Sequence, residues 1–564
     1  MEADKVRTGT PRINLLLAAI TIALLSSLLA AQTAQPPARH PAGPVFGPVV
    51  SEKGMVTSSH PLAAQAGLRI LREGGNAFDA AAAVAVAVGV LESDETDGIT
   101  GEGFGIFYIA KTGEVKVVDW GSRIPDNPEF LKHVQDTRQQ DNPVNLIAPG
   151  ALAGIDSVVK TLGKLTLAQV LQPSIEYCEQ GIPVREDLRR AIEHRAEVLR
   201  KDPNAAAIFL PDGKVPPLGY PLKMLDEARS LRLIATQGKD VLYKGELAKE
   251  ILAWSKEVGG LITPADMEFV SKPRWVQPLS TTYHGYTIYA VPPASGGIPL
   301  LQAMNILEGF NLKGMSEAER THIFAETFKI SLNEMETYFG DPDRTNSRLQ
   351  ELLSKDYAAK LRAEIQPDKV LPWKLVSHDE PTEHGTTTFA VVDAEGNVAS
   401  ITNTRSSWGI ARPAGHTGLF LHAGTRLLSA NPNHPMYVRP GKRLQKSIAP
   451  YLVLDSQKRV VMAAGASGGR TITHTNAQVL VNVLDLGMNI EQAIAAPRVS
   501  YSGAGQKLEV GYGFFPDTVE SLRKLGYDIR RAEVGGAQGI TIDPVTKGRM
   551  GGADPRRDGG VAAY

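Results

Sequence analysis

A threonine-rich stretch contains the first groups that could do chemistry. Three threonines stand in a row at 386–388, and Thr404 follows eighteen positions after the first of them. The runs 386–392 and 398–404 are typical of strands, and the letters DAEGN between them are typical of a turn. A hairpin that is symmetric about this turn places Thr386 opposite Thr404. Two hydroxyl groups would then meet at its open end.

A threonine hydroxyl needs a base beside it before it becomes a useful nucleophile. Nearby in the sequence only His384 offers a side-chain base. Cleavage between Gly385 and Thr386 offers another, because the new α-amine, with a pKa of about 7.7–8.0, would lie next to the hydroxyl. Glycine suits such a scissile turn, since it tolerates strained backbone. Threonine is also a favoured strand residue, so on spacing alone an ordinary structural strand is the favoured interpretation and the nucleophile is the alternative.

The letters GASGG, residues 465–469, are a second candidate. They match G-x-S-x-G, the nucleophile elbow of α/β-hydrolases, with an apolar run before them and a helical pattern after them. That fold needs an acid and then a histidine after the serine. The last histidine, His474, lies only seven residues after Ser467 with no acid between them, so the triad cannot be built. A turn that presents backbone N–H groups is the favoured interpretation.

Composition excludes several other functions. A net charge of −1 over 564 residues gives no electrostatic case for nucleic acid. Cys178 is the only cysteine, which excludes an internal disulfide and a cysteine-based zinc site. We find no metal-ligand cluster, and no cofactor is implied. Glycines 101, 103 and 105 suggest a phosphate loop, but neither a helix nor a Lys-Ser/Thr pair follows them.

The N-terminal part of the body predicts two helices. The first begins at Pro61 and ends before Gly74, since proline suits the first turn and glycine the end. Asn76 can cap a second helix at 77–91, which is apolar all round and should therefore be buried. At this length it is too short to span a bilayer.

Later segments are mixed in pattern. The stretch 149–374 is mostly helical, and within it 292–310 predicts a loop followed by an amphipathic helix. The letters FGDPD at 339–343 predict a turn. From 386 to about 455 the pattern changes to short strands, and a strand and a helix are expected on either side of GASGG.

The N-terminus is typical of an export signal. Basic residues precede the apolar run 13–31, and a proline-rich linker follows at 32–53. We therefore predict a signal peptide at 1–31, with an uncleaved membrane anchor as the alternative. Both interpretations place the body outside the cytoplasm, in the periplasm or secreted, with no membrane contact beyond the signal segment.

A set of longer motifs then appears in a specific order. They are GMVTSSHPLAAQAGLRILREGGNAFDAA, PPASGGIPLLQAMNILEGF, TTTFAVVDAEGNVASITNT, GASGG and the ending GGADPRRDGGVAAY. On these residues the chain from about Gly54 to Tyr564 resembles the γ-glutamyltransferase family of N-terminal nucleophile hydrolases. The resemblance implies an α+β fold, a four-layer αββα sandwich, made as a proenzyme. Self-cleavage would give a large helix-rich subunit at 54–385 and a small β-rich subunit at 386–564.

The resemblance also implies roles for individual residues. Thr386, freed by cleavage after Gly385, would be the nucleophile and its α-amine the base, with Thr404 in support. Gly468 and Gly469 match the pair whose backbone N–H groups form the oxyanion hole. The reaction would pass from a small-molecule amide through a Thr-acyl ester to water or an amine acceptor.

Positions that bind substrate in typical members differ in this chain. The arginine that grips the substrate carboxylate is replaced by Gly121, with Arg123 as a possible substitute because it offers a bidentate fork. The aspartate that holds the substrate amine is replaced by Leu427. Of two paired serines only Ser447 is retained, because the first position is Lys446.

Two further changes concern the rim of the expected pocket. An asparagine of the family corresponds to Ser406, and a lid loop between Leu428 and Lys442 is short. Arg426, Arg405 and Lys446 would make the rim more positive. We retain Ser447, Arg123, Ser406, Lys446 and Arg426 as candidate substrate-binding residues.

Three hypotheses follow. The first is a hydrolase or transferase of γ-glutamyl amides such as glutathione, which family frequency favours. The second is a related amidohydrolase or acylase acting on another amide, which the lost aspartate favours. The third is an exported binding protein on an inactive scaffold, which the intact threonines and glycines argue against.

Overall fold

A computed structural model describes residues 47–96, 98–139, 141–338, 340, 348–374, 385–427, 435, 437–501 and 506–564. They belong to one compact unit, Pro44–Tyr564. The expected signal peptide, most of the linker and, apart from Gly340, the turn expected at 339–343 lie outside these ranges. Within them, no helix combines the length and the apolar character that crossing a bilayer requires.

Two antiparallel sheets of seven strands each form the centre of the unit. The first has the order β1 (Val49–Ser51), β18 (Arg549–Ala553), β17 (Gly536–Ile542), β13 (Val460–Ser467), β12 (Tyr451–Leu454), β9 (Tyr286–Ala290), β8 (Leu279–Tyr283). The second has the order β19 (Gly560–Ala563), β2 (Met55–Ser58), β10 (Thr386–Val392), β11 (Val398–Thr404), β3 (Glu102–Ile109), β4 (Glu114–Asp119), β7 (Arg274–Val276).

The two sheets pack face to face. A buried apolar cluster between them includes Phe104 and Ala390 from the second sheet and Leu452 and Ile540 from the first. A direct link crosses the same interface, where the Ser400 hydroxyl donates to the carbonyl oxygen of Ala464 at 2.9 Å. The two sheets are therefore the two inner layers of the sandwich.

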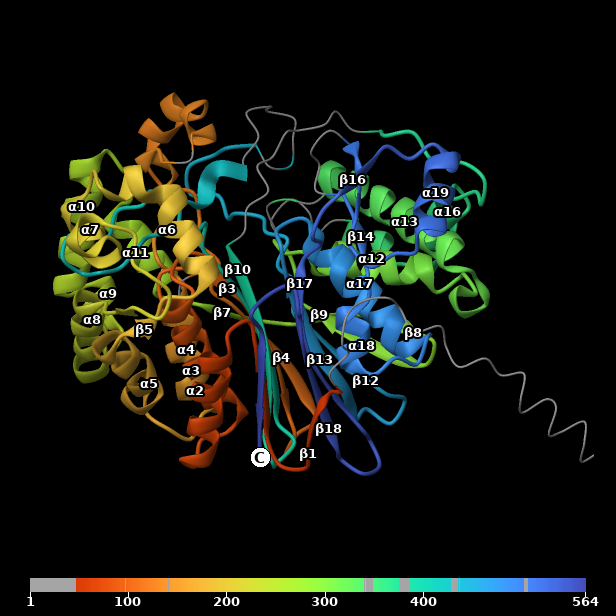
Figure 1. Cartoon of the computed structure of the whole chain (residues 1–564), viewed down its shortest axis with the longest axis horizontal. Helices are drawn as coiled ribbons and strands as arrows, with labels where there is room; N and C mark the ends of the chain where they lie inside the picture. Colours follow the sequence, from red (N-terminus) through yellow and green to blue (C-terminus); the bar gives the residue numbers. More distant parts are fainter. Residues whose placement is uncertain are drawn as a thin grey trace, which may run out of the picture. The chain divides into compact units, whose positions relative to one another are not determined.

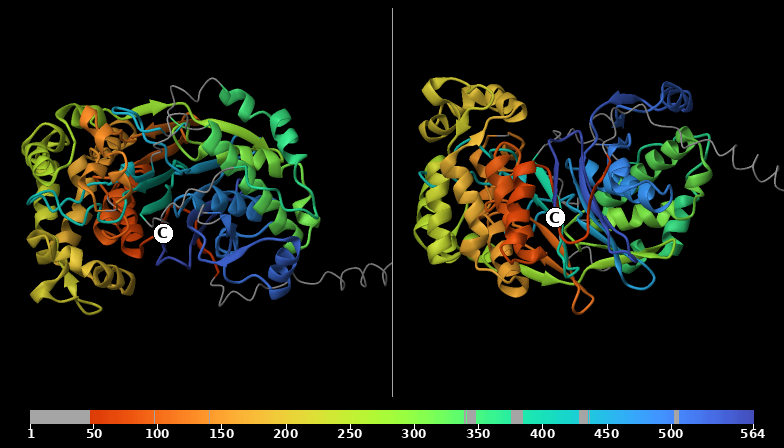
Figure 2. Two further views of the ribbon diagram at one scale, coloured as in Figure 1. Left: turned by 90° about the horizontal axis from the view of Figure 1, so that it is seen from above. Right: turned by 60° about the horizontal axis from the view of Figure 1, so that its bottom comes forward.

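Helices cover both outer faces (Figure 1). The second sheet carries α2 (Pro61–Arg72), α3 (Ala77–Leu91), α4 (Ala151–Leu162) and α5 (Leu167–Gln180) in one large core; α6 (Glu186–Leu199), α8 (Leu225–Gln237) and α10 (Glu246–Val258) extend it. Helices α12 (Gly297–Leu307), α13 (Glu317–Tyr338), α17 (Thr471–Leu484), α18 (Ile490–Ala495) and α19 (Pro516–Leu525) share another core with the first sheet. The four-layer αββα prediction is therefore confirmed, and Figure 2 shows the same layers from two other directions.

The predicted N-terminal helices are confirmed with their caps. Asn76 accepts hydrogen bonds from two backbone N–H groups at the start of α3, and every residue of α3 is buried, as its uniform apolar character requires. Two expectations for the middle of the chain need correction. Helix α12 is buried on all sides, not amphipathic. Strands β7, β8 and β9 also lie within the stretch expected to be mostly helical.

Both sheets contain strands from before and after Thr386. The second takes β2, β3, β4 and β7 from before it and β10, β11 and β19 from after it. The two predicted subunits would thus share both sheets and one buried interface. Their boundaries, at 54–385 and 386–564, stay predictions.

Candidate active site

The β10–β11 hairpin has the predicted register, with Thr386 directly opposite Thr404. The two hydroxyl oxygens are 2.8 Å apart, and the Thr404 hydroxyl is also 2.8 Å from the carbonyl oxygen of Gly385. A carbonyl oxygen can only accept, so the single Thr404 proton points to Gly385. The Thr386 proton must then point to Thr404. The three groups form a directed chain from the Thr386 hydroxyl to the carbonyl in front of it.

Thr386 faces the space between the two sheets. Side chains alternate along a strand, so Thr386 and Thr388 share one face of β10. Thr388 contacts Gly465 of β13 in the opposite sheet, where the glycine leaves room for the threonine hydroxyl. Thr387 points the other way, with its hydroxyl 2.6 Å from that of Ser59. Thr386 is half-buried at the open end of the space between the sheets, whereas Thr387 and Thr388 are fully buried.

Gly385 is buried in a position that excludes any side chain. A Cβ there would overlap the carbonyl oxygen of Arg405 and lie 3.1 Å from both the Glu95 carbonyl oxygen and the Ser407 nitrogen. Its own carbonyl oxygen accepts a second hydrogen bond, from the Arg405 N–H at 2.9 Å. Glycine is needed here because of close approach.

Gly468 and Gly469 form the turn from β13 into α17. Their φ angles are 118° and 60°, in the left-handed region that favours glycine. A Cβ on Gly468 would also lie 3.0 Å from the Cα of Gly535. The turn therefore needs two glycines for conformational reasons, as the glycine-turn interpretation predicted.

Contacts link this turn to the Gly385 junction. Gly536 lies opposite Ser467 in β17 and packs against Arg557. Arg557 forms an ion pair with Glu95 at 3.0 Å, and the Glu95 carbonyl oxygen adjoins Gly385. The glycine turn and the threonine pair thus belong to one contiguous region. The oxyanion-hole role of the two turn N–H groups stays a prediction.

The rejected triad at Ser467 has no support in the geometry. The Ser467 hydroxyl donates to the Gly536 carbonyl oxygen at 3.3 Å. His474 lies 2.7 Å from the Ser500 hydroxyl and stacks on Phe328. Burial lowers the pKa of His474 to about 3, so this imidazole is a neutral core residue.

Glu102 extends the row of functional side chains. It lies opposite Thr404 at the start of β3, so Thr386, Thr404 and Glu102 share one face across three adjacent strands. The Lys446 ammonium is 2.7 Å from one carboxylate oxygen, and the His422 ring is 3.2 Å from the other. Burial alone raises the pKa of Glu102, but the charge of Lys446 and the hydrogen bond from His422 outweigh it, and the pKa falls to about 2.

Ser406 holds His422 in one tautomer. The Ser406 N–H donates to Nδ1 of His422 at 3.0 Å, so Nδ1 carries no proton and Nε2 donates to Glu102. The Ser406 hydroxyl is 3.1 Å from the carbonyl oxygen and the N–H of Ala423. Ser406 thus supports the Glu102 network, and its substrate-binding role stays a prediction.

Lys446 also occupies the space beside Gly121. Its ammonium lies 2.8 Å from the point where a Cβ of residue 121 would stand. The resemblance implies an arginine where this chain has Gly121, and here the Lys446 ammonium lies beside that position. A carboxylate, Glu102, already neutralises it.

The other candidate residues differ in their availability. Arg123 is mostly buried, with Nε 2.9 Å from Asp266 and its guanidinium over the Phe269 ring, so a substrate carboxylate would have to share it. The Ser447 hydroxyl is half-buried and has no hydrogen-bond partner in the described part of the chain. Arg426 and Leu427 lie in a short 3-10 helix, but the structure does not describe their side chains. Most of the expected short lid also lies outside the described residues.

The expectation of a more positive rim is wrong for two of its three cations. Arg405 is 0% exposed and Lys446 is 8% exposed. The Arg405 guanidinium donates to backbone carbonyl oxygens, and the Lys446 ammonium binds Glu102. Neither presents its charge to solvent.

Glu102 and His422 were not predicted as members of the site. Glu102 is a charged residue within a glycine-rich run, which is a usable signal, because a buried carboxylate requires a partner. His422 gave no local signal, since its partners are about sixteen and 320 positions away in the chain.

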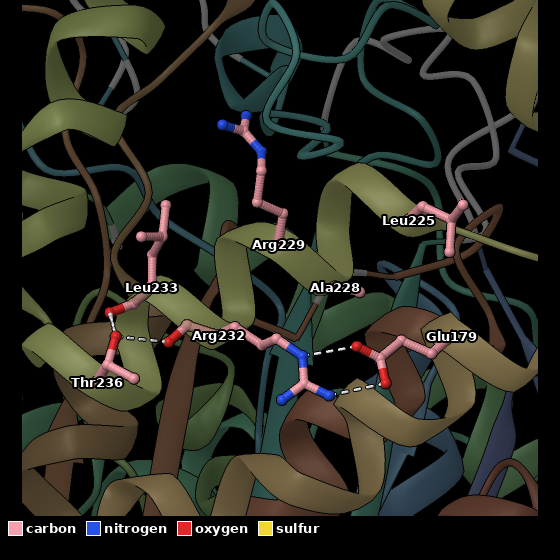
Figure 3. Close-up of a pocket in the computed structure, with 7 residues that line it drawn as sticks. All are labelled: Glu179, Leu225, Ala228, Arg229, Arg232, Leu233 and Thr236. Atoms are coloured by element: carbon pink, nitrogen blue, oxygen red, sulfur yellow. Dashed lines mark hydrogen bonds and ion pairs between the residues drawn. The ribbon is translucent and has the colours of Figure 1, made fainter.

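A separate shallow hollow lies in the outer helical layer (Figure 3). Its lining comes from α8 and the end of α5: Glu179, Leu225, Ala228, Arg229, Arg232, Leu233 and Thr236. The Arg232 guanidinium is held by Glu179 at 2.6 and 2.8 Å. None of the groups described above lines it. In the described ranges, no three His, Cys, Asp and Glu side chains are placed to hold a metal ion.

An αββα sandwich with a strand-initial threonine directed at the carbonyl before it defines the class of N-terminal nucleophile hydrolases. A family model described as gamma-glutamyltranspeptidase matches residues 63–564. The glutathione hydrolase proenzyme of Escherichia coli K12 is 33% identical over 91% of this chain and 92% of its own. The acylase ACY 1 proenzyme of Pseudomonas sp. SE83 is also 33% identical, over 88% and 91%.

A solved structure adds to this comparison. The cephalosporin acylase from Bacillus halodurans has a TM-score of 0.84 at 29% identity, covering 94% of this chain and 99% of its own. The chain belongs to the γ-glutamyltranspeptidase family, and it is a hydrolase or acyltransferase of that family.

Proposed function

We propose that the protein cleaves itself between Gly385 and Thr386 and then hydrolyses γ-glutamyl amides, glutathione among them, through a Thr-acyl ester. The observation that carries this proposal is the directed hydrogen-bond chain from Thr386 through Thr404 to the Gly385 carbonyl. In the proposed reaction these three groups would act as nucleophile, proton relay and electrophile, and their hydrogen bonds in the uncleaved chain support that assignment.

Self-cleavage would begin with attack of the Thr386 oxygen on the Gly385 carbonyl carbon. A C–O bond forms, and the C–N bond breaks after the Thr386 nitrogen takes a proton. Thr404 is hydrogen-bonded to both the Thr386 hydroxyl and the Gly385 carbonyl oxygen, so it can take the hydroxyl proton while it donates its own to the developing oxyanion. The oxyanion passes that proton to the nitrogen as the carbonyl re-forms. Water then hydrolyses the ester, which leaves a Gly385 carboxylate and a Thr386 with a free amine and a free hydroxyl.

Turnover would repeat the attack on an external amide. The free α-amine accepts the Thr386 proton and returns it to the leaving amine. The N–H groups of Gly468 and Gly469 would stabilise the oxyanion, a contribution typically worth about 10²–10³ in rate for each donor. Water completes hydrolysis, and an amine acceptor in its place completes transfer.

The substrate rests on relatives and on the pocket. Glutathione hydrolase proenzymes at 30–33% identity support γ-glutamyl amides. A second candidate is acylase activity on another amide. The acylase relatives favour it. The ion pair between Glu102 and Lys446 favours it too, because the Lys446 ammonium beside Gly121 is already neutralised by a carboxylate and is less able to bind a substrate carboxylate.

The two fragments would remain associated through the shared sheets. The export signal predicted from the sequence favours a periplasmic or secreted location for the processed enzyme. Large and small subunits of one precursor are then the expected protein partners.

A gel and a substrate panel test the proposal. Purified protein should separate into two fragments, with Thr386 as the new N-terminus by sequencing. The mature enzyme should release γ-glutamyl groups from glutathione and from a γ-glutamyl anilide faster than it cleaves a panel of N-acyl amides. A chain that stays whole, with the Thr386→Ala variant indistinguishable from wild type, would refute self-cleavage. Cleavage with turnover of acyl amides alone would select the second candidate.

A further inference from the structure

The carbonyl oxygen of Gly385 has two donors in the uncleaved chain. One is the Thr404 hydroxyl at 2.8 Å, and the other is the backbone N–H of Arg405 at 2.9 Å. Attack by Thr386 would turn this oxygen into an oxyanion. The Arg405 N–H is therefore already placed where negative charge would develop.

The Arg405 side chain reaches the opposite wall of the same junction. Its guanidinium donates to the carbonyl oxygens of Ser93 and Thr96, the latter at 2.8 Å, and to that of Phe420 at 3.3 Å. Residues 92–96 form the turn that follows α3, closed by hydrogen bonds from Glu95 and Thr96 back to Glu92. Arg405 holds this turn from inside, with 0% of its surface exposed.

Gly385 lies between these two elements. The Glu95 carbonyl oxygen, from the middle of the turn, is 3.1 Å from the Cβ position of Gly385. The carbonyl oxygen of Arg405 closes the other side. One residue therefore supplies a backbone donor to the scissile carbonyl and, through its side chain, sets the distance to the facing wall.

The complete burial of the Arg405 guanidinium calls for a physical explanation. Burying an arginine costs free energy that an apolar side chain of similar volume would avoid, and fold stability alone gives little return for it. Side-chain contacts from Arg557 and Ser59 also hold the 92–96 turn, at Glu95 and Glu92, but Arg405 is bound to its backbone carbonyl oxygens and ties them to β11.

We propose that Arg405 is a positioning residue for self-cleavage, which holds the Gly385 carbonyl against Thr386 by tying the 92–96 turn to β11. The inference rests on the proposed self-cleavage. It does not make Arg405 a nucleophile, an acid or a base. Its effect falls on the first step, in which the Thr386 oxygen displaces the Thr386 nitrogen from the Gly385 carbon and an ester forms.

The test compares Arg405→Lys and Arg405→Met with Arg549→Lys. Arg549 is a matched control, because it is also buried and donates to backbone carbonyls, those of Glu52 and Asp393, at the other end of the β10–β11 hairpin. We expect the rate of fragment formation on gels to fall about tenfold for the lysine variant and further for the methionine variant, since small displacements of reacting groups are costly. Arg549→Lys should cleave at close to the wild-type rate.

Two measurements separate positioning from general damage. Melting temperatures are taken in a Thr386→Ala background, where all chains stay whole, and rates are compared between variants of equal stability. Hydroxylamine, which cleaves esters, should not restore the rate of Arg405→Lys, because the ester forms slowly. Rescue by hydroxylamine, or equal rates for the Arg405 and Arg549 variants, would overturn the inference. If wild-type protein itself never cleaves, the proposed function fails instead.

Discussion

The ammonium of Lys446 lies 2.8 Å from the point where a Cβ of Gly121 would stand, so these two positions share one space. Lys446 is held there by Glu102 at 2.7 Å. A side chain at position 121 would therefore require the Lys446 ammonium, and the Asp119 carboxylate oxygen that is also 2.8 Å away, to move.

This relationship predicts a strong coupling between the two positions. Gly121→Arg alone should lower the melting temperature, because the new side chain must displace Lys446 and Asp119, and overpacking typically costs about 1–3 kcal/mol. The double variant Gly121→Arg with Lys446→Ser should recover part of that loss and raise activity on γ-glutamyl anilide. Gly47→Arg is the matched control, since nothing lies within 4 Å of a Cβ there. Additive effects of the two substitutions would contradict a shared space.

Removing the Thr404 hydroxyl should slow self-cleavage. Thr404→Val keeps the shape of the side chain but breaks the relay to Gly385, and loss of a proton-transfer group typically costs about 10²–10⁴ in rate. Thr404→Ser should retain most of the rate. Thr402→Val is the control, because Thr402 lies two residues inward on the same face and pairs with Thr388 at 3.1 Å. Gel densitometry over time measures all three, and a fast Thr404→Val would exclude the relay.

Glu102→Gln should destabilise the protein through Lys446. The substitution leaves a buried ammonium without its counter-charge, and breaking such a pair typically costs about 3–5 kcal/mol. Adding Lys446→Met should restore much of the stability, because neither charge then remains. Denaturant unfolding of the two single variants and the double variant gives the coupling energy directly. A coupling near zero would show that the pair does not act as a unit.

Two buried carboxyl groups, Glu92 and Asp94 in the turn after α3, should make the stability of the protein depend on pH. Burial raises the pKa of Glu92 from 4.5 to about 7, and burial with the nearby Glu95 charge raises that of Asp94 to about 7. At a pH between the unfolded-state and native-state pKa values, each of these carboxyl groups keeps its proton in the native state and has lost it in the unfolded chain. The contribution is fully present below the unfolded-state pKa values, 4.5 for Glu92 and 3.8 for Asp94, and is lost as the pH rises through about 7.

The measurement for this prediction is a series of melting curves from pH 4.5 to 8. Glu92→Gln should flatten the decline and melt higher than wild type at pH 8. Glu193→Gln, at an exposed position on α6, should follow the wild-type curve. If wild type is no less stable at pH 8 than at pH 5, these carboxyls are not held protonated.

Local patterns predicted much of the architecture that carries the site. The capped helices α2 and α3 and the β10–β11 register follow from short-range rules of capping and alternation, which need no knowledge of the rest of the chain. Strands β7, β8 and β9 were missed, because short strands inside a long helical stretch carry little signal of their own. The buried state of α12 was missed because a loop followed by a mixed helix gives no information on what covers it.

The sequence by itself determined the order of the chemistry-bearing residues: Thr386 behind a glycine, Thr404 one strand away, and a two-glycine turn after β13. Only the tertiary structure decided which groups meet. Glu102, His422, Lys446 and Gly121 come from four separate segments, and Arg405, expected at a charged rim, is buried against the turn after α3. The physical reason is that hydrogen bonds and ion pairs act over about 3 Å. Spacing along a strand sets such distances locally, whereas between segments they depend on how two sheets and their helices pack.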